Sequence, residues 1–354
     1  MEKIYKYRPL SSFLFKELLY QELYFASYTE LNDPLDLSLL LEFTITDKED
    51  VSYLIWFLFK TSLDIDNESE KLVQINLINF YNDDVLFHQL KEEIYKNVQN
   101  LQEPIYVHKI IDIVQKAIKK TRINVVFNLS SFTKELERLT SKFFQNSYVT
   151  CFSETNDNYL MWSHYSSSHS GICLEFSSEY RGDFAYESKE LRNPNAKKYA
   201  ERASEWDMKS IIYKDQIWKV AYSNEQSYVN FFKFRAVFEN EFNCDLIGLS
   251  KSWTHEYARE LQRLLCVKTK AWEYEKEWRS VRINFDRKLE SEERIDYYPV
   301  EALTGIYFGV NTPESVKIRI LRIMNRKNSK VNFYNSVLEN NGDMYFIDWD
   351  YKDE

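Results

Sequence analysis

The chain has 354 residues and a net charge of −9, with 44% hydrophobic and 29% charged residues. It is long enough for one large core or two domains. The acidic balance excludes a protein whose main task is to coat nucleic acid, because neutralising phosphates requires a basic surface. One basic run near the C-terminus is a local exception, and such runs are more often the solvated face of a helix. Its members are Lys317, Arg319, Arg322, Arg326, Lys327 and Lys330.

Cysteine and glycine usage narrow the class further. The four cysteines stand far apart, without zinc-ligand spacing and without the pattern of a disulfide framework. The N-terminus has no apolar segment after its charges and no run is long enough to span a bilayer, so a cytoplasmic protein is expected. All six glycines lie at or after Gly171, which excludes a P-loop or a dinucleotide-binding turn from the N-terminal half.

The first zone, residues 1–36, predicts a strand, a helix and a second strand. The strands cover 4–8 and 22–26, and Ser11 or Ser12 caps a helix that continues through Leu19. The segment 31–36 combines Asn, Asp and Pro and predicts a turn. Apolar spacings of three and four then predict a helical zone over 37–147. Its expected helices are 49–61, 84–98, 107–120 and 133–146.

From residue 148 onward strands return. We expect a short helix over 158–165, capped by Asn156 or Asp157, helices over 224–242 and 246–265, and a helix that Thr312 caps. The segment 183–210 predicts a loop with a short helix, and Asn340-Asn341-Gly342-Asp343 predicts a hairpin turn. The expected strands are 148–153, 171–176, 219–222, 272–284, 304–309, 331–337 and 344–349.

These elements predict an α+β fold with a mixed sheet and a helical insertion. Residues 1–36 and 148–354 are expected to form the core domain, and 37–147 the helical insertion. The insertion's periodicity indicates a packed core and says nothing of chemistry.

The stretch from Trp272 to Arg279 carries glutamates at every second position. On a strand, alternate residues share a face, so Glu273, Glu275 and Glu277 would point the same way. Two adjacent carboxylates are able to divide acid and base roles or to stabilise a developing cation. The alternative is an edge strand with a solvated acidic face, which any half-buried strand would show.

Several motifs appear in a fixed order: YKYR, LNDPLD, CFSE, MWSHY, GICLEF, WEYEKEWR and GIYFG. Together they resemble an uncharacterised bacterial family of domains of unknown function. The resemblance covers residues 4–36 and 148–310 and leaves the helical zone unmatched. It names a family and implies no reaction.

A second, more distant resemblance does imply a reaction. The order of a strand-borne arginine, a serine at a strand end and a Glu-x-Glu stretch is similar to the Arg–Ser–Glu triad of NAD-dependent ADP-ribosyltransferases. Arg8, Ser153 and the pair Glu275 and Glu277 fall on these positions, with Glu277 at the invariant one. This family implies a split sheet, largely antiparallel, and NAD as substrate. The chain departs from it at Cys151-Phe152-Ser153, where Ser-Thr-Ser is usual.

The resemblance implies a role for each residue. Glu277 would hold the ribose hydroxyls and stabilise an oxocarbenium-like state, and Glu275 would accept a proton from the attacking group. Arg8 would bind the NAD phosphates, and Ser153 would order Glu277 by hydrogen bonding. The side chains expected to stack on nicotinamide or adenine are Tyr7, Tyr28 and Tyr165.

Structural roles compete with each assignment. Arg8 would equally pair with Asp33 or Asp36 to brace the turn. Ser153 would cap the turn that follows it. Arg279 would hold Glu277 or Glu154 in an ion pair, and His164 is as well explained by a buried hydrogen bond as by general-base catalysis.

Three functions follow from these residues. The first is an NAD-consuming ADP-ribosyltransferase or NAD glycohydrolase, a toxin-like effector in bacterial anti-phage defence, which acts on a protein or nucleic-acid acceptor. The second is a metal-dependent nuclease or phosphodiesterase that uses Asp33, Asp36, Glu275 and Glu277 as oxygen ligands. The third is a non-catalytic module that binds a regulatory partner through the helical insertion.

Overall fold

The structure is a computed structural model, and it describes most of the chain. The described residues are 3–62, 79, 84–98, 105–121, 128–177, 211–212, 217–225, 227–233, 261–284, 287–327 and 329–351. The loop and short helix expected over 183–210 lie outside them, as does most of the helix expected over 246–265.

The chain divides into two compact units. Unit 1 comprises Met1–Leu37, Gln145–Glu225 and Leu265–Glu354, and unit 2 comprises Ser38–Phe144 and Gln226–Leu264. Residues 226–264, which were expected in the core domain, belong to unit 2.

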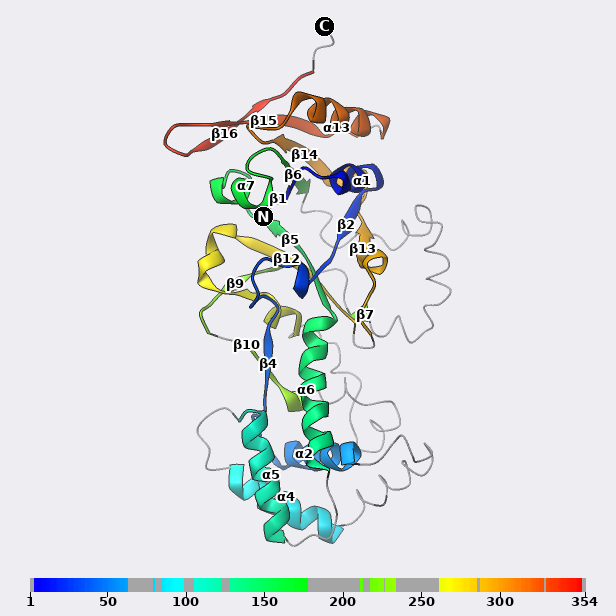
Figure 1. The fold of residues 1–354 in the computed structure, drawn as a ribbon, viewed down its shortest axis with the longest axis vertical. Helices are drawn as coiled ribbons and strands as arrows, with labels where there is room; N and C mark the ends of the chain where they lie inside the picture. The colour runs from blue at the N-terminus through cyan, green and yellow to red at the C-terminus, as the bar shows by residue number, and fades with distance from the viewer. Residues whose placement is uncertain are drawn as a thin grey trace. The chain divides into compact units, whose positions relative to one another are not determined.

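Unit 1 is built on a ten-stranded sheet with the order β16-β15-β14-β6-β1-β5-β12-β7, in which β3 also pairs with β5 and β8 with β12 (Figure 1). All pairs are antiparallel except β14 with β15. The expected α+β class with a mixed, largely antiparallel sheet is confirmed. The strands are β1 Lys3–Arg8, β3 Ala26–Ser27, β5 Ser147–Ser153, β6 Ile172–Ser177, β7 Ile211–Ile212, β8 Ile217–Lys219, β12 Glu277–Asn284, β14 Leu303–Phe308, β15 Asn332–Leu338 and β16 Met344–Asp348.

The sheet parts between β1 and β5. These two strands share a single register pair, Tyr5 with Ser153. On either side the pairing is continuous, because β1 pairs with β6 along its whole length and β5 with β12 from Ser147 to Ser153. The sheet therefore consists of two blocks that meet at one residue of each strand.

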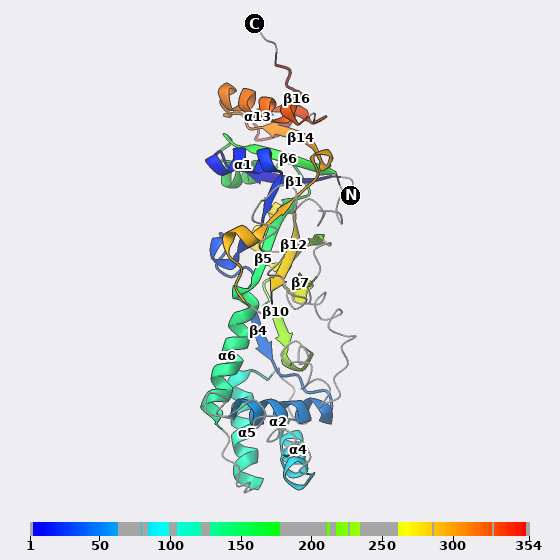
Figure 2. The ribbon, with the colours of Figure 1, turned by 90° about the vertical axis from the view of Figure 1, so that its right-hand side faces the viewer.

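Alternation along the strands gives the sheet two apolar faces. One face carries Leu174 of β6 and Ile306 of β14 in a core with helices α1 (Ser12–Tyr20) and α13 (Glu314–Arg326). The opposite face carries Cys173 and Tyr307, the next residue along each strand, in a cluster with helix α7 (Tyr159–Tyr165). Figure 2 shows α1 and α13 on one side of β1, β6 and β14.

Local capping explains where these helices begin. Ser11 caps α1 by accepting from the backbone N–H of Leu14, as predicted. The cap of α7 is Asn158, not the predicted Asn156 or Asp157. The predicted cap of α13 is also wrong, because the Thr312 hydroxyl donates to the carbonyl of Gly171 instead.

Unit 2 is mainly helical. All four helices expected in this zone are present, although the last begins earlier than predicted. They are α2 Lys48–Ser62, α4 Asp84–Val98, α5 Val107–Thr121 and α6 Leu129–Gln145. A parallel pair, β4 (Leu39–Glu42) with β10 (Ser227–Asn230), replaces the start of the helix expected over 224–242. The rings of Phe43, Phe57 and Phe231 pack together in the core of unit 2.

Two short strand pairs complete unit 1. Strand β2 (Glu22–Tyr24) pairs with β13 (Ile295–Tyr297), and β9 (Ala221–Tyr222) pairs in parallel with β11 (Val267–Lys268). The strand expected over 219–222 is therefore divided between β8 and β9. The predicted hairpin is present, with Gly342 at φ 92° in the turn. Among the described residues, no helix has the length and apolar character needed to cross a membrane.

Candidate active site

The two glutamates Glu275 and Glu277 are brought together by a turn. Residues Lys270–Glu275 form a 3-10 helix, η6, and β12 begins only at Glu277. Between them Lys276 adopts φ 44°, in the left-handed region. The strand predicted over 272–284 is thus wrong in its first part. Both side chains are nonetheless buried, with exposed fractions of 2% and 4%, whereas Glu273 is exposed.

The Ser153 side chain holds the backbone of this turn. It is the register partner of Glu277, and its hydroxyl donates to the carbonyl oxygen of Glu275 at 2.8 Å. The predicted hydrogen bond to the Glu277 carboxylate is not the one that it makes. The alternative capping role is present as well, because the N–H of Thr155 donates to the same hydroxyl at 3.3 Å. Ser153 therefore positions the glutamates from the strand β5 side.

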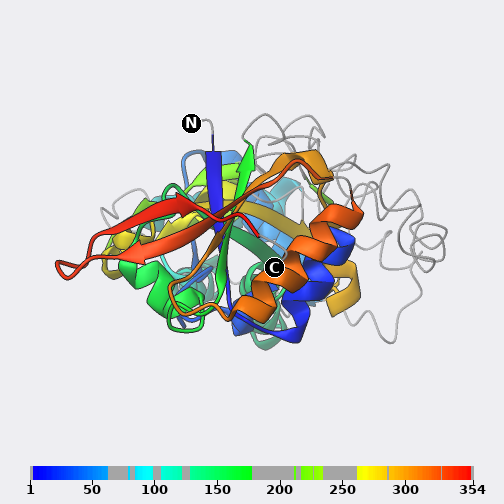
Figure 3. The ribbon, with the colours of Figure 1, turned by 90° about the horizontal axis from the view of Figure 1, so that it is seen from above.

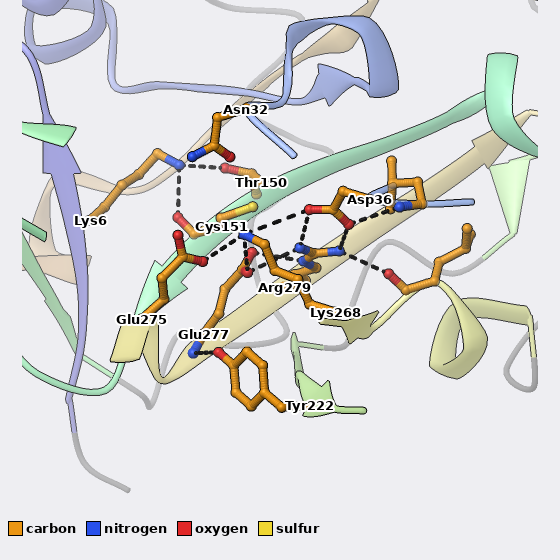
Figure 4. Close-up of polar contacts among 12 residues, drawn as sticks. Lys6, Asn32, Asp36, Thr150, Cys151, Tyr222, Lys268, Glu275, Glu277 and Arg279 are labelled. Atoms are coloured by element: carbon orange, nitrogen blue, oxygen red, sulfur yellow. Dashed lines mark hydrogen bonds and ion pairs between the residues drawn. The ribbon is translucent and has the colours of Figure 1, made fainter. Parts of the chain in front are cut away.

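Lys268, the last residue of β11, lies among three carboxylates. Its ammonium is 2.6 Å from Glu275 Oε2, 3.4 Å from Glu277 Oε2 and 3.8 Å from Asp36 Oδ2. All four side chains are buried. Figure 4 shows the ammonium between the carboxylates. A single cation thus links both glutamates to the turn that follows β3.

Arg279 provides the second cation, and every edge of its guanidinium is used. Nε and Nη2 donate to the two oxygens of Glu277 at 2.7 and 3.0 Å. Nη1 and Nη2 donate to the two oxygens of Asp36, and Nη1 also donates to the carbonyl of Leu265. The expectation that Arg279 holds Glu277 is confirmed. Such two-point pairing fixes geometry as well as charge.

The network reaches solvent on the Glu275 side. The Tyr165 hydroxyl donates to Glu275 Oε1, and the Asn32 amide donates to the Tyr165 oxygen at 2.6 Å. Asn32 is exposed and Tyr165 is half-buried. Two aromatic rings lie at this end. The centre of the Trp272 ring is 4.6 Å from the Lys268 ammonium, and Trp272 packs beside Tyr274. Glu275 is therefore the outer carboxylate and Glu277 the inner one.

The pKa values of the two glutamates are shifted in opposite directions. Burial raises the pKa of Glu277, but attraction to Arg279 and Lys268 outweighs burial and holds this pKa at about 2. Burial also raises the pKa of Glu275, and repulsion by Glu277 adds to it, so this pKa stays above its ordinary range despite Lys268. Burial would lower the pKa of Lys268, but the carboxylates raise it, so it stays charged.

This arrangement has a defined chemical capacity. Three carboxylates face two cations, so the cluster carries one excess negative charge when all are ionised. Glu277 stays ionised, whereas Glu275, with its raised pKa, takes up a proton at a higher pH than an ordinary carboxyl does. Pairs of acids whose pKa values are driven apart are typical of acid–base sites.

Arg8, the predicted arginine of the triad, lies apart from the cluster. Arg8 is bound by Glu17 through two hydrogen bonds, one of them 2.7 Å long, and by neither Asp33 nor Asp36. Three residues of strand, roughly 10 Å, separate it from Tyr5, where β1 meets β5. Two of the three triad positions, Ser153 and Glu277, are thus together, and the arginine is not with them.

The remaining aromatic candidates differ in position. The Tyr7 hydroxyl donates to the carbonyl of Thr155 at 3.0 Å, and its ring packs edge-on against Trp162. Tyr28 is half-buried at the start of the short helix η1 (Tyr28–Glu30). His164 is exposed, so the alternative of a buried histidine is wrong, and its ring lies 6.2 Å from that of Tyr274.

Several site residues were missed from sequence. Lys268 has no motif around it, and Asp36 was considered only as a metal ligand or a partner of Arg8. The Tyr222 hydroxyl accepts from the backbone N–H of Glu277 at 2.8 Å. Lys6 fills the gap where β1 leaves β5, donating to Thr150 Oγ1 and the carbonyl of Cys151. Only the polar LNDPLD turn gave a usable signal for this side of the site.

Fold and site together define an α+β protein in which a parted sheet holds a buried cluster of carboxylates and cations. Residues 161–280 match the model of a family described as "Protein of unknown function (DUF2971)". The matched segment contains Lys268, Glu275, Glu277 and Arg279, so it carries most of the cluster. No curated protein and no solved structure matches the chain.

Proposed function

We propose that the protein cleaves the nicotinamide–ribose bond of NAD, as an ADP-ribosyltransferase or an NAD glycohydrolase. The observation that carries this proposal is the pair formed by an ionised Glu277 and a Glu275 with a raised pKa, beside Ser153 at the point where the sheet parts. The order of Ser153 and the Glu-x-Glu stretch resembles that of the ADP-ribosyltransferases.

The reaction needs little from a general acid, because nicotinamide leaves as a neutral molecule. The bond between ribose C1′ and the nicotinamide nitrogen breaks, and its electron pair goes to nicotinamide. The ribose is left as an oxocarbenium-like cation. The excess negative charge of the cluster, with Glu277 at its centre, stabilises this cation electrostatically.

Glu275 then acts as the base. Water, or a nucleophilic group of an acceptor, attacks C1′ and gives its proton to Glu275. The outer position of Glu275 fits this role, since it lies next to the exposed end of the network at Asn32. Tyr165 and Lys268 each hold one of its oxygens, which leaves its orientation fixed during proton transfer.

NAD would be recognised by aromatic rings near the cluster. Tyr165 and Trp272 lie beside Glu275 and offer rings to the nicotinamide. Tyr7 and Tyr28 remain candidates for the adenine. Arg8 would bind the phosphates only by exchanging Glu17 for them. In a cell, NAD consumption or acceptor modification of this kind would make the protein a toxin-like effector, for example in anti-phage defence.

The test is nicotinamide release from NAD by the purified protein, with and without protein or nucleic-acid acceptors. We expect Glu277→Gln and Glu275→Gln each to lower the rate by about 100-fold or more. Glu273→Gln is the matched control, because this neighbouring glutamate is exposed and outside the cluster. Circular dichroism establishes that each variant is folded.

Two results would overturn the proposal. One is that wild-type protein releases no nicotinamide under any of these conditions. The other is that release occurs but a folded Glu277→Gln variant retains the wild-type rate.

A further inference from the structure

Helix α13 presents a row of three arginines to solvent. Arg319, Arg322 and Arg326 are exposed, and their spacing of three and four residues places them on one face. The buried residues Ile320 and Met324 occupy the opposite face, against the sheet. The arginines therefore form a continuous outward row along the helix.

In the described part of unit 1, this row has no acidic partner. Lys317, on the flank of the same helix, pairs with Glu314 at 3.3 Å and donates to Asn335. By contrast, in the described part of the chain none of the three arginines has a carboxylate within 4.0 Å. The chain as a whole carries −9, so an unpaired positive row runs against its general charge.

Helix α1 borders the arginine row and adds exposed rings. The Arg319 guanidinium lies 3.8 Å from the centre of the Phe15 ring, which places the two helices in contact. Figure 3 shows α1 and α13 side by side. Phe13 and Tyr20, seven residues apart on the outer side of α1, are 68% and 45% exposed. Both side chains are thus open to contact from solvent.

This surface is separate from the candidate active site. Trp278 packs into the core under α1 and α13, so Glu277 and Arg279, its neighbours on β12, point to the other face of the sheet. Whatever binds over α1 and α13 does not occupy the carboxylate cluster.

We propose that the face formed by Arg319, Arg322 and Arg326 of α13 with Phe13 and Tyr20 of α1 binds single-stranded nucleic acid. Arginine forks bind phosphate oxygens, and each of the three would contact one phosphate of the backbone. Bases of a single strand are free to stack on the exposed rings, which is how sequence-tolerant binding gains affinity. A purely acidic protein partner would use the arginines and leave the rings without a role.

The experiment measures binding of the full chain to a labelled single-stranded oligonucleotide of about 12 nucleotides by fluorescence anisotropy. Three phosphate contacts predict a slope of about −2 for log affinity against log salt, or about 20-fold weaker binding at 200 mM than at 50 mM salt. The triple variant Arg319→Gln, Arg322→Gln, Arg326→Gln should lose at least 10-fold in affinity and flatten this slope. Phe13→Ala combined with Tyr20→Ala should weaken binding by about 30-fold or more, because each stacked base contributes about 1 kcal/mol or more, and should leave the slope unchanged.

The matched control removes the same charge from another surface. Lys116→Gln, Lys119→Gln, Lys134→Gln changes three exposed lysines of unit 2 and should bind as wild type does. Equal losses in the two triple variants would overturn the proposal, because net charge alone would then explain binding. It is also overturned if duplex DNA binds more tightly than the single strand, or if only vesicles that contain phosphatidylserine are bound.

Discussion

Arg279 and Asp36 face each other across two hydrogen bonds of 2.6 Å, formed by residues 243 positions apart in the chain. Both side chains are buried, at 0% and 1% exposure. This contact joins the turn after β3 to strand β12 and closes the inner end of the carboxylate cluster. The Arg279 guanidinium is fully buried, so its N–H groups need acceptors from the protein, and Asp36 supplies two of them.

Removing Asp36 should therefore be costly to stability. In Asp36→Ala, Arg279 stays charged and buried with two of its donors unpaired, and breaking a buried pair in this way costs about 3–5 kcal/mol. Urea unfolding monitored by tryptophan fluorescence measures the change. Glu135→Ala is the control, since its pair with Arg138 lies on the exposed side of α6 and should contribute about 1 kcal/mol or less. A loss below about 1 kcal/mol in Asp36→Ala would show that the pair is not a stabilising element.

The two glutamates should affect stability with opposite pH dependence. The pKa of Glu277 is lowered to about 2, so the folded state binds this proton less tightly than the unfolded chain does. Its contribution, about 3 kcal/mol, is present above the ordinary carboxyl pKa and is lost as pH falls toward 2. The stability difference between wild type and Glu277→Gln should therefore narrow on acidification below about pH 4.5.

Glu275 should behave in the reverse way. Because burial raises its pKa, the folded state keeps the proton longer, and stability falls as pH rises above the ordinary carboxyl pKa. Wild type should lose stability relative to Glu275→Gln over that range. Unfolding measured from pH 3 to pH 8, with Glu273→Gln as a flat reference, tests both signs. Parallel curves for the two glutamine variants would contradict the assignment.

Sequence pattern predicted the class of fold because periodicity reports which face of an element is buried. The helices of unit 2 follow directly from it, whereas the hairpin at Gly342 follows from the residue types of its turn. The same reasoning failed at Glu275. The alternation of Glu273, Glu275 and Glu277 predicts a continuous strand. The residue types give no sign that the backbone of Lys276 adopts the left-handed conformation.

The composition of the site was predictable only in part, for a related reason. Ser153 and Glu277 meet because β5 and β12 pair in register. The order of their motifs along the chain, by its resemblance to the ADP-ribosyltransferase triad, predicted that they would share a site. Lys268 and Asp36 join them through tertiary packing between distant segments, which carries no local signature. Motif order alone placed Arg8 in the site, but its guanidinium pairs with Glu17 of α1 instead.

The left-handed turn makes a prediction of its own. A residue with a side chain pays a conformational cost at φ 44°, whereas glycine occupies this region freely. Lys276 is exposed and its side chain is outside the cluster. Lys276→Gly should therefore be neutral or raise the free energy of unfolding by up to about 1 kcal/mol, and Lys276→Val should lower it by about 1–2 kcal/mol. Equal stabilities for the two variants would show that this backbone conformation is not required by the turn.

Tyr165→Phe offers the sharpest test of Glu275 as the base. The Tyr165 hydroxyl donates to Glu275 and favours its ionised form, so removing the hydroxyl should raise the pKa of Glu275 further. The acidic limb of the pH–rate profile for nicotinamide release should move to higher pH, while the rate on the plateau changes much less. Tyr159→Phe is the control, because Tyr159 packs on His169 away from the cluster. An acidic limb that stays in place when the Tyr165 hydroxyl is removed would mean that a group other than Glu275 accepts the proton.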